Sequence, residues 1–128
     1  MNIVPIVFCF DDNLQLPAGV CISSLLEHAK NSTFYDIFIL HDTHCEFPTN
    51  GFLELLHSKY SNFKITYRSV GRAFEEAYEV RGITVAAYYR LLIPELIQEY
   101  DVIMYHDVDI IFRDDLSDIF ARTNMDEY

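Results

Sequence analysis

Short apolar runs alternate with segments of helical periodicity along this chain. Three runs rich in β-branched and aromatic side chains are predicted to be strands: residues 3–10, 35–40 and 63–70. Three segments with apolar residues three or four positions apart are predicted to be helices: residues 17–30, 52–60 and 85–92. Pro17 suits the start of the first helix, Thr49 or Asn50 could cap the second, and Pro94 is expected to end or kink the third.

A fourth strand is expected over residues 100–106, and a short helix or turn around residues 73–78. Alternating strands and helices predict an α/β layer fold with a mainly parallel sheet. The chain has 128 residues and no repeat, linker or low-complexity segment, so residues 1–128 are expected to form one domain. In such sheets ligands bind beyond the carboxyl ends of the strands.

Composition and charge narrow the function. The chain is 51% hydrophobic, which predicts a buried core, and its 20 Asp and Glu against 9 Lys and Arg give a net charge of −11. This excess argues against nucleic acid and against electrostatic docking on anionic lipid, and a phosphate site would need a cation. Three cysteines without a CxxC pair, no signal peptide and no membrane-spanning run predict a cytoplasmic protein with reduced thiols.

Asp107-Val108-Asp109 carries the main chemical signal. Residues two apart on an extended segment point to the same side, so the two carboxylates are expected to project together. Carboxylates held this close repel each other unless a cation or a proton separates them. Mg²⁺ and Mn²⁺ prefer oxygen ligands of this kind. The triplet alone leaves two interpretations open, a metal site and a structural aspartate turn.

Other polar positions are equally open to two interpretations. Asp11-Asp12-Asn13 could simply close the first strand, or it could present a carboxylate and an amide to the polar edge of a base. Arg90 could be solvated, or it could meet hydroxyl and phosphate oxygens of a substrate. The segment His41-Asp42-Thr43-His44-Cys45 lacks a second half with zinc-finger spacing and is interpreted as a loop.

The sequence lacks the signatures of several other classes of site. It contains no GxxxxGK[ST], GxGxxG or GxSxG motif. An EF-hand would need a ligand and a glycine where Ile111 and Phe112 stand. An aspartyl phosphotransferase usually continues with a small, turn-forming pair, which Ile110-Ile111 does not provide.

Three segments, in this order, resemble glycosyltransferase family 8, whose members are retaining, nucleotide-sugar-dependent enzymes of the GT-A fold. They are residues 7–13, residues 84–91 with a Tyr-x-Arg-Leu signature, and residues 102–112 around the DxD triplet. The resemblance implies that Asp107 and Asp109 bind Mn²⁺ or Mg²⁺, which bridges the donor diphosphate. It also implies a donor-binding set: Cys9, Asp11, Asn13, Arg90 and Val108. Asp11 and Asn13 would contact uracil, the backbone near Cys9 the nucleoside, and Arg90 the donor sugar.

Two residues depart from the family pattern. His106 stands where the family usually has an apolar residue, and strand alternation points it away from the metal, so it is expected to pack rather than to coordinate. Leu14 stands where an aromatic residue often stacks on uracil.

The resemblance implies a hexosyltransferase that uses a UDP-sugar donor and a saccharide or glycolipid acceptor. Family members take a third metal ligand, a phosphate-binding lysine and much of the acceptor site from a C-terminal segment that follows the stretch resembled here. We therefore expect this chain to be the donor-binding portion, inactive alone, with peripheral membrane association through the C-terminal half. One alternative is a non-catalytic UDP-binding module or truncated paralogue. Another is a nucleotidyltransferase, which is expected to carry a Gly-rich basic loop where this chain has Asp11-Asp12-Asn13-Leu14.

Overall fold

The computed structural model describes residues 2–10, 14–41, 51–70 and 90–123. Four strands form one parallel sheet in the order β3-β2-β1-β4. The strands are β1 (Asn2–Cys9), β2 (Thr33–His41), β3 (Phe63–Ser69) and β4 (Met104–Tyr105). The predicted α/β fold with a parallel sheet is therefore confirmed, together with the first three strands.

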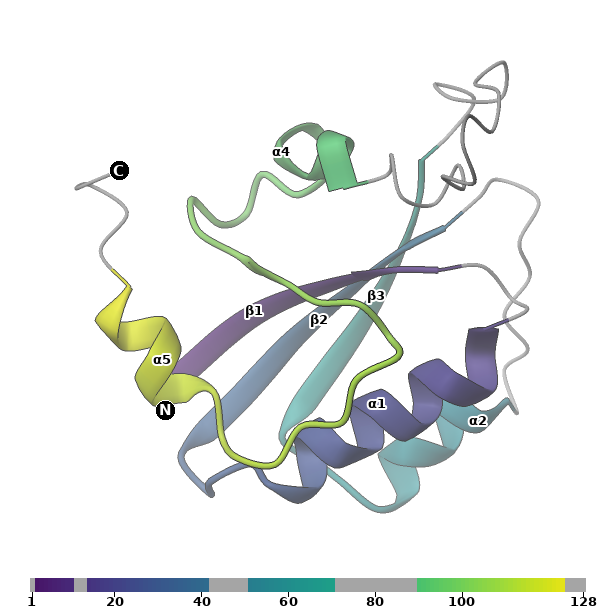
Figure 1. Cartoon of the computed structure of the whole chain (residues 1–128), viewed down its shortest axis with the longest axis vertical. Coiled ribbons are helices and arrows are strands. Elements are labelled where there is room, and N and C mark those ends of the chain that lie inside the picture. Colours follow the sequence, from purple (N-terminus) through teal and green to yellow (C-terminus); the bar gives the residue numbers. More distant parts are fainter. Residues whose placement is uncertain (1, 11–13, 42–50, 71–89, 124–128) are drawn as a thin grey trace.

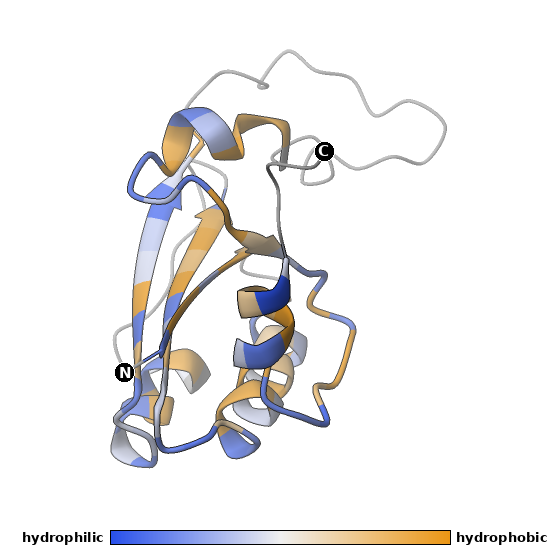
Figure 2. Cartoon of the chain, turned by 90° about the vertical axis from the view of Figure 1, so that its left-hand side faces the viewer, coloured by the Kyte–Doolittle hydropathy of each residue, from blue (hydrophilic) through white to orange (hydrophobic). Residues whose placement is uncertain are grey.

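The two central strands are buried on both faces, which explains their nearly continuous apolar sequences. Ile6 and Phe8 of β1 belong to a core cluster on one face of the sheet, and Val7 belongs to a second cluster on the other face. Figure 2 shows hydrophobic stretches along the inner strands of the sheet, whereas the edge strand β3 is mostly pale or hydrophilic. Burying one such side chain stabilises the fold by about 1.5–3 kcal/mol.

Helices α1 (Gln15–Glu27) and α2 (Phe52–Leu55) lie on the same side of the sheet (Figure 1). Helix α1 buries residues at helical spacing: Ala18, Cys21, Ile22, Leu25 and Leu26. The predicted second helix, residues 52–60, is α-helical only over α2 and continues as a 3₁₀ turn, η2 (Leu56–Ser58). Gly51 occupies the position before α2, and the proposed caps Thr49 and Asn50 lie outside the described residues.

The other face of the sheet is covered by the segment that leads into β4. It begins with a 3₁₀ turn, η3 (Arg90–Leu92), and continues as α4 (Ile93–Leu96). Pro94 lies in the first turn of α4, and whether it ends or kinks the predicted helix over residues 85–92 stays a prediction. Proline is tolerated in the first turn because the N–H that it lacks has no partner there. Most of the predicted third helix, residues 85–89, lies outside the described residues.

Two polar side chains tie this segment to the sheet. The Tyr100 hydroxyl donates a 2.6 Å hydrogen bond to Oδ2 of the buried Asp36 on β2. Arg68 on β3 donates to the Leu96 carbonyl and to both oxygens of Glu99. The hydrogen bonds from Arg68 lower the pKa of Glu99 from 4.5 to about 2. These contacts hold the chain over the second core cluster immediately before it enters the sheet.

After β4 the chain crosses to the α1 side and ends in α5 (Ser117–Arg122), which lies near the amino end of β1 (Figure 1). The buried Asp115 carboxylate accepts hydrogen bonds from the Lys30 N–H at 2.8 Å and from the Ser117 N–H at 2.8 Å. The Leu116 N–H donates to the Tyr35 hydroxyl at 3.0 Å. Within the described ranges, none of the helices has the length and apolar character needed to cross a bilayer.

Candidate donor and metal site

The strand order creates a switch point between β1 and β4. Strands β2 and β3 follow β1 on one side, whereas β4 pairs with β1 on its other side. In open parallel sheets the crevice at such a point, beyond the carboxyl ends of the strands, is where ligands bind. Cys9 ends β1 here, and Asp107 follows β4 by two residues.

The DxD triplet lies in a bend just beyond β4, which is only two residues long, so the expected strand over residues 100–106 was too long. The alternation predicted for an extended segment is nevertheless present. Asp107 and Asp109 are exposed, whereas Val108 is 8% exposed and joins the core cluster beneath α1. Both carboxylates are therefore open to solvent while the residue between them anchors the backbone.

Tyr105 contributes to the geometry of the first aspartate. Its hydroxyl donates a 3.1 Å hydrogen bond to Oδ1 of Asp107. This contact follows from strand alternation, since residues 105 and 107 lie on the same side of the chain. The hydrogen bond engages one of the two Asp107 oxygens, and both Asp107 and Asp109 remain exposed to solvent.

Helix α1 holds the backbone at the first residue of the triplet and again three residues after the triplet. The Cys21 thiol donates to the Asp107 carbonyl at 3.8 Å, and the Phe112 N–H donates to Oγ of Ser24 at 2.9 Å. Burial raises the pKa of Cys21 to about 11, and the Asp109 charge acts in the same direction against a backbone hydrogen bond from Ile110. Cys21 is therefore a neutral thiol, able to donate, at physiological pH.

His106 is a packed neighbour of the site, as its position in the alternation predicts. Its ring meets Phe112 edge-to-face, with centroids 5.1 Å apart, and its Nε2 is buried with no hydrogen-bond partner among the described residues. Burial lowers the pKa of His106, and the charge of Asp107 offsets part of that effect. The imidazole is therefore neutral at pH 7.

The described residues supply two carboxylates as candidate ligands for a cation. Among these residues, no group of three or more His, Cys, Asp or Glu side chains is placed to hold a metal ion. Two exposed carboxylates in a chain of net charge −11 fit a hard divalent ion that keeps positions for phosphate oxygens and water.

Comparison with known proteins decides the family. Residues 5–128 match the sequence profile of glycosyl transferase family 8. The chain belongs to this family. No curated protein sequence matches the chain significantly.

Solved structures agree with the family assignment. The apo structure of the bifunctional glycosyltransferase WbbM is 30% identical with a TM-score of 0.75, over 95% of this chain and 21% of that one. The galactosyltransferase LgtC, in complex with donor and acceptor sugar analogues, is 25% identical with a TM-score of 0.72, over 94% of this chain and 43% of that one. Mouse xyloside xylosyltransferase 1, at 14% identity and a TM-score of 0.64, shares the fold over 94% of this chain and 48% of that one. These neighbours have the GT-A fold, and this chain spans less than half the length of each.

The described structure includes only some of the donor-binding residues predicted for this family 8 chain. Cys9, Val108 and both aspartates of the triplet lie at the switch point, whereas Asp11 and Asn13 lie outside the described residues. Arg90 is the first residue of η3, and its side chain is not described. In the segment interpreted as a loop, only His41 is described, and it belongs to β2.

Sequence reasoning missed the three residues that hold the triplet in place. Alternation could have identified Tyr105, because it precedes Asp107 by two positions. No local pattern pairs Cys21 or Ser24 with residues more than eighty positions away.

Proposed function

We propose that this family 8 domain binds a UDP-sugar through Mn²⁺ or Mg²⁺ held by Asp107 and Asp109. In the whole enzyme it would serve retaining transfer of a hexose to a saccharide or glycolipid. The observation that carries this proposal is the exposure of both carboxylates, with Val108 buried between them, at the switch point of the sheet.

Electrostatics explains why a cation is needed. The chain has a net charge of −11, and the two carboxylates at the site would repel a bare diphosphate. A divalent ion between carboxylates and diphosphate removes this repulsion, and when bound it would stabilise the negative charge that develops on departing UDP. The Tyr105 hydroxyl, by donating to Oδ1, would orient the Asp107 carboxylate for this role.

The remaining donor contacts come from the segments around the switch point. Asp11 and Asn13 follow β1 and would hydrogen-bond the uracil, while the backbone at Cys9 would approach the nucleoside. Val108 would keep its backbone close to the donor because its side chain is anchored in the core. Similarity to the galactosyltransferase LgtC, which was solved with donor and acceptor sugar analogues, supports a sugar donor for the whole enzyme.

The function is tested by binding and turnover together. UDP should bind far more tightly with Mn²⁺ than with EDTA in isothermal titration calorimetry. The longest natural polypeptide that contains this chain should hydrolyse or transfer a UDP-hexose only with the metal. Equal affinity with and without metal would contradict the proposal, and metal-dependent binding without turnover would identify a binding-only module.

Arg90→Ala should weaken binding of a UDP-sugar more than binding of UDP, because Arg90 is proposed to contact the sugar. The loss for the UDP-sugar should be about 1.5–3 kcal/mol, the contribution of a hydrogen bond to a charged group. Calorimetry with both ligands measures the difference, and Arg113→Ala, at an exposed arginine of the described chain, is the matched control. An equal loss for both ligands would place Arg90 on the nucleotide instead.

A further inference from the structure

We infer that Cys21 and Ser24 of α1 are positioning residues for the metal-binding segment. They hold the backbone of residues 107–112 and thereby set where the Asp107 and Asp109 carboxylates stand. The inference rests on the proposed metal-binding function of these two aspartates. It assigns a positioning role to two residues of α1, a helix that carries none of the predicted metal ligands.

The Ser24 hydroxyl links the segment to α1 in two directions. It accepts the Phe112 N–H at 2.9 Å and donates to the Cys21 carbonyl at 2.6 Å. Only a hydroxyl side chain as short as that of serine or threonine can accept from one backbone group and donate to another at this place. Alanine would leave the part-buried Phe112 N–H without its partner.

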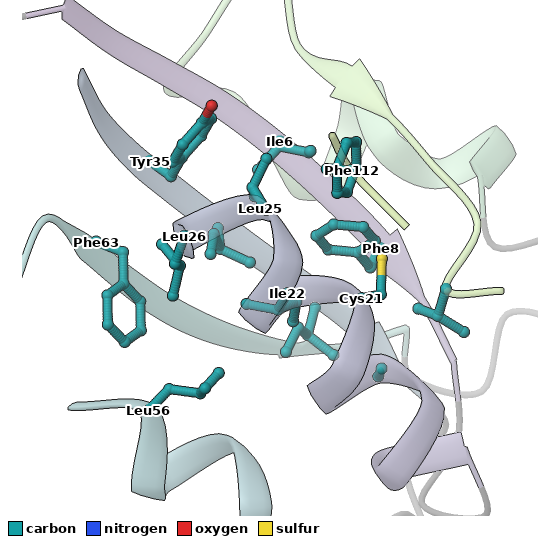
Figure 3. Close-up of a cluster of buried hydrophobic side chains, with 14 of the residues drawn as sticks. Ile6, Phe8, Cys21, Ile22, Leu25, Leu26, Tyr35, Leu56, Phe63 and Phe112 are labelled. Atoms are coloured by element: carbon teal, nitrogen blue, oxygen red, sulfur yellow. The ribbon is translucent and has the colours of Figure 1, made fainter. Parts of the chain in front are cut away.

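Cys21 holds the other end of the same segment. Its side chain is fully buried, and its thiol donates to the Asp107 carbonyl at 3.8 Å. Figure 3 shows the Cys21 and Phe112 side chains beside Phe8 in one cluster. The two contacts thus bracket the triplet, one at its first aspartate and one at residue 112.

These contacts matter because the sheet stops supporting the chain before the triplet begins. Strand β4 pairs with β1 only through Met104 and Tyr105, and one further hydrogen bond joins the His106 N–H to the Val7 carbonyl at 3.3 Å. Beyond that point, α1 supplies the backbone contacts that a longer strand would have obtained from its neighbour.

The first test measures the anchoring without metal. Ser24→Ala should speed amide hydrogen exchange at Phe112 and across residues 107–112 by about five- to tenfold, the loss of one hydrogen bond. Ser23→Ala, on the adjacent residue of α1, is the control and should leave exchange there unchanged, while Ser24→Thr should restore protection. Unchanged exchange at Phe112 in Ser24→Ala would overturn the proposal.

The second test measures the consequence for the metal. Ser24→Ala should weaken the Mn²⁺-dependent affinity for UDP by about 10–100-fold, as removal of a partner that orients metal ligands does. Ser24→Thr should keep the Mn²⁺-dependent affinity, and in Ser24→Ala the affinity for UDP in EDTA should not change. Cys21→Ala should lower the same affinity if Ser24→Ala does not fold.

Faster amide exchange in Ser24→Ala together with full Mn²⁺-dependent affinity for UDP would show a merely structural contact and overturn the positioning role. If Mn²⁺ did not raise the UDP affinity of the wild-type protein, the proposed function would be overturned instead. The amide exchange result would still show whether Ser24 anchors residues 107–112.

Discussion

Replacing Asp107 or Asp109 with asparagine is expected to remove the gain in UDP affinity that Mn²⁺ provides. In an active enzyme it should also lower sugar transfer by about 10²–10³-fold, the usual cost of losing one group that stabilises a developing charge. Asparagine keeps the shape of the side chain but not its negative charge, so the ion loses half of the protein charge that holds it. Both side chains are exposed, so the fold itself should be nearly unchanged.

Calorimetry with Mn²⁺ and with EDTA checks the binding result, and thermal unfolding checks the fold. Asp101→Asn is the matched control, because it makes the same charge change at an exposed residue before β4 rather than after it. It should keep the full Mn²⁺ effect. A Mn²⁺ effect that persists in both triplet variants would place the cation elsewhere.

Replacing Asp115 with alanine is expected to lower the free energy of unfolding by about 3 kcal/mol, the largest stability effect predicted for a polar residue of this chain. The buried carboxylate accepts from two backbone N–H groups, those of Lys30 and Ser117, and from the Ser117 hydroxyl at 2.5 Å. Alanine leaves these donors without their partner, at about 1–3 kcal/mol for each unsatisfied buried group. The contact joins the turn before β2 to the start of α5, so both would loosen.

The same residue predicts a dependence on pH. Burial raises the pKa of Asp115, but hydrogen bonds from Ser117 and from the Lys30 N–H outweigh it and hold the pKa below 3.8. A carboxyl group whose pKa is lower in the folded state stabilises the protein above its unfolded pKa, and this contribution is lost as the pH falls through the folded value. The stability difference between wild type and Asp115→Asn should therefore be largest near neutral pH and shrink below about pH 3.9.

Chemical denaturation at pH 7, 5 and 3 measures both effects. Asp118→Asn is the control, because Asp118 is an exposed residue paired with Lys30 at 3.2 Å. Such surface pairs contribute about 0–1 kcal/mol. A loss for Asp115→Ala no larger than that of the control would show that the hydrogen bonds to this carboxylate contribute little.

The fold class and three of the four strands could be predicted from local patterns along the chain. Strands β1 and β2 could be predicted because burial on both faces gives a continuous apolar run, and helix α1 because its buried residues recur at helical spacing. Strand β3 was visible in the alternation of Phe63, Ile65 and Tyr67.

Alternation along an extended segment predicted that Asp107 and Asp109 share one side and that His106 packs rather than coordinates, and the structure adds that Val108 is buried between the two aspartates. Together with the resemblance of three ordered segments, these patterns led to the family that the comparison confirmed.

The tertiary structure decided what depends on residues far apart in the chain. It placed β4 against β1 and so created the switch point, limited β4 to Met104–Tyr105, and put Pro94 in the first turn of α4. It also brought Cys21 and Ser24 to residues 107 and 112. Periodicity reports which face of an element is buried but not which element covers it, so contacts between side chains and backbone across more than eighty residues become visible only once the chain is folded.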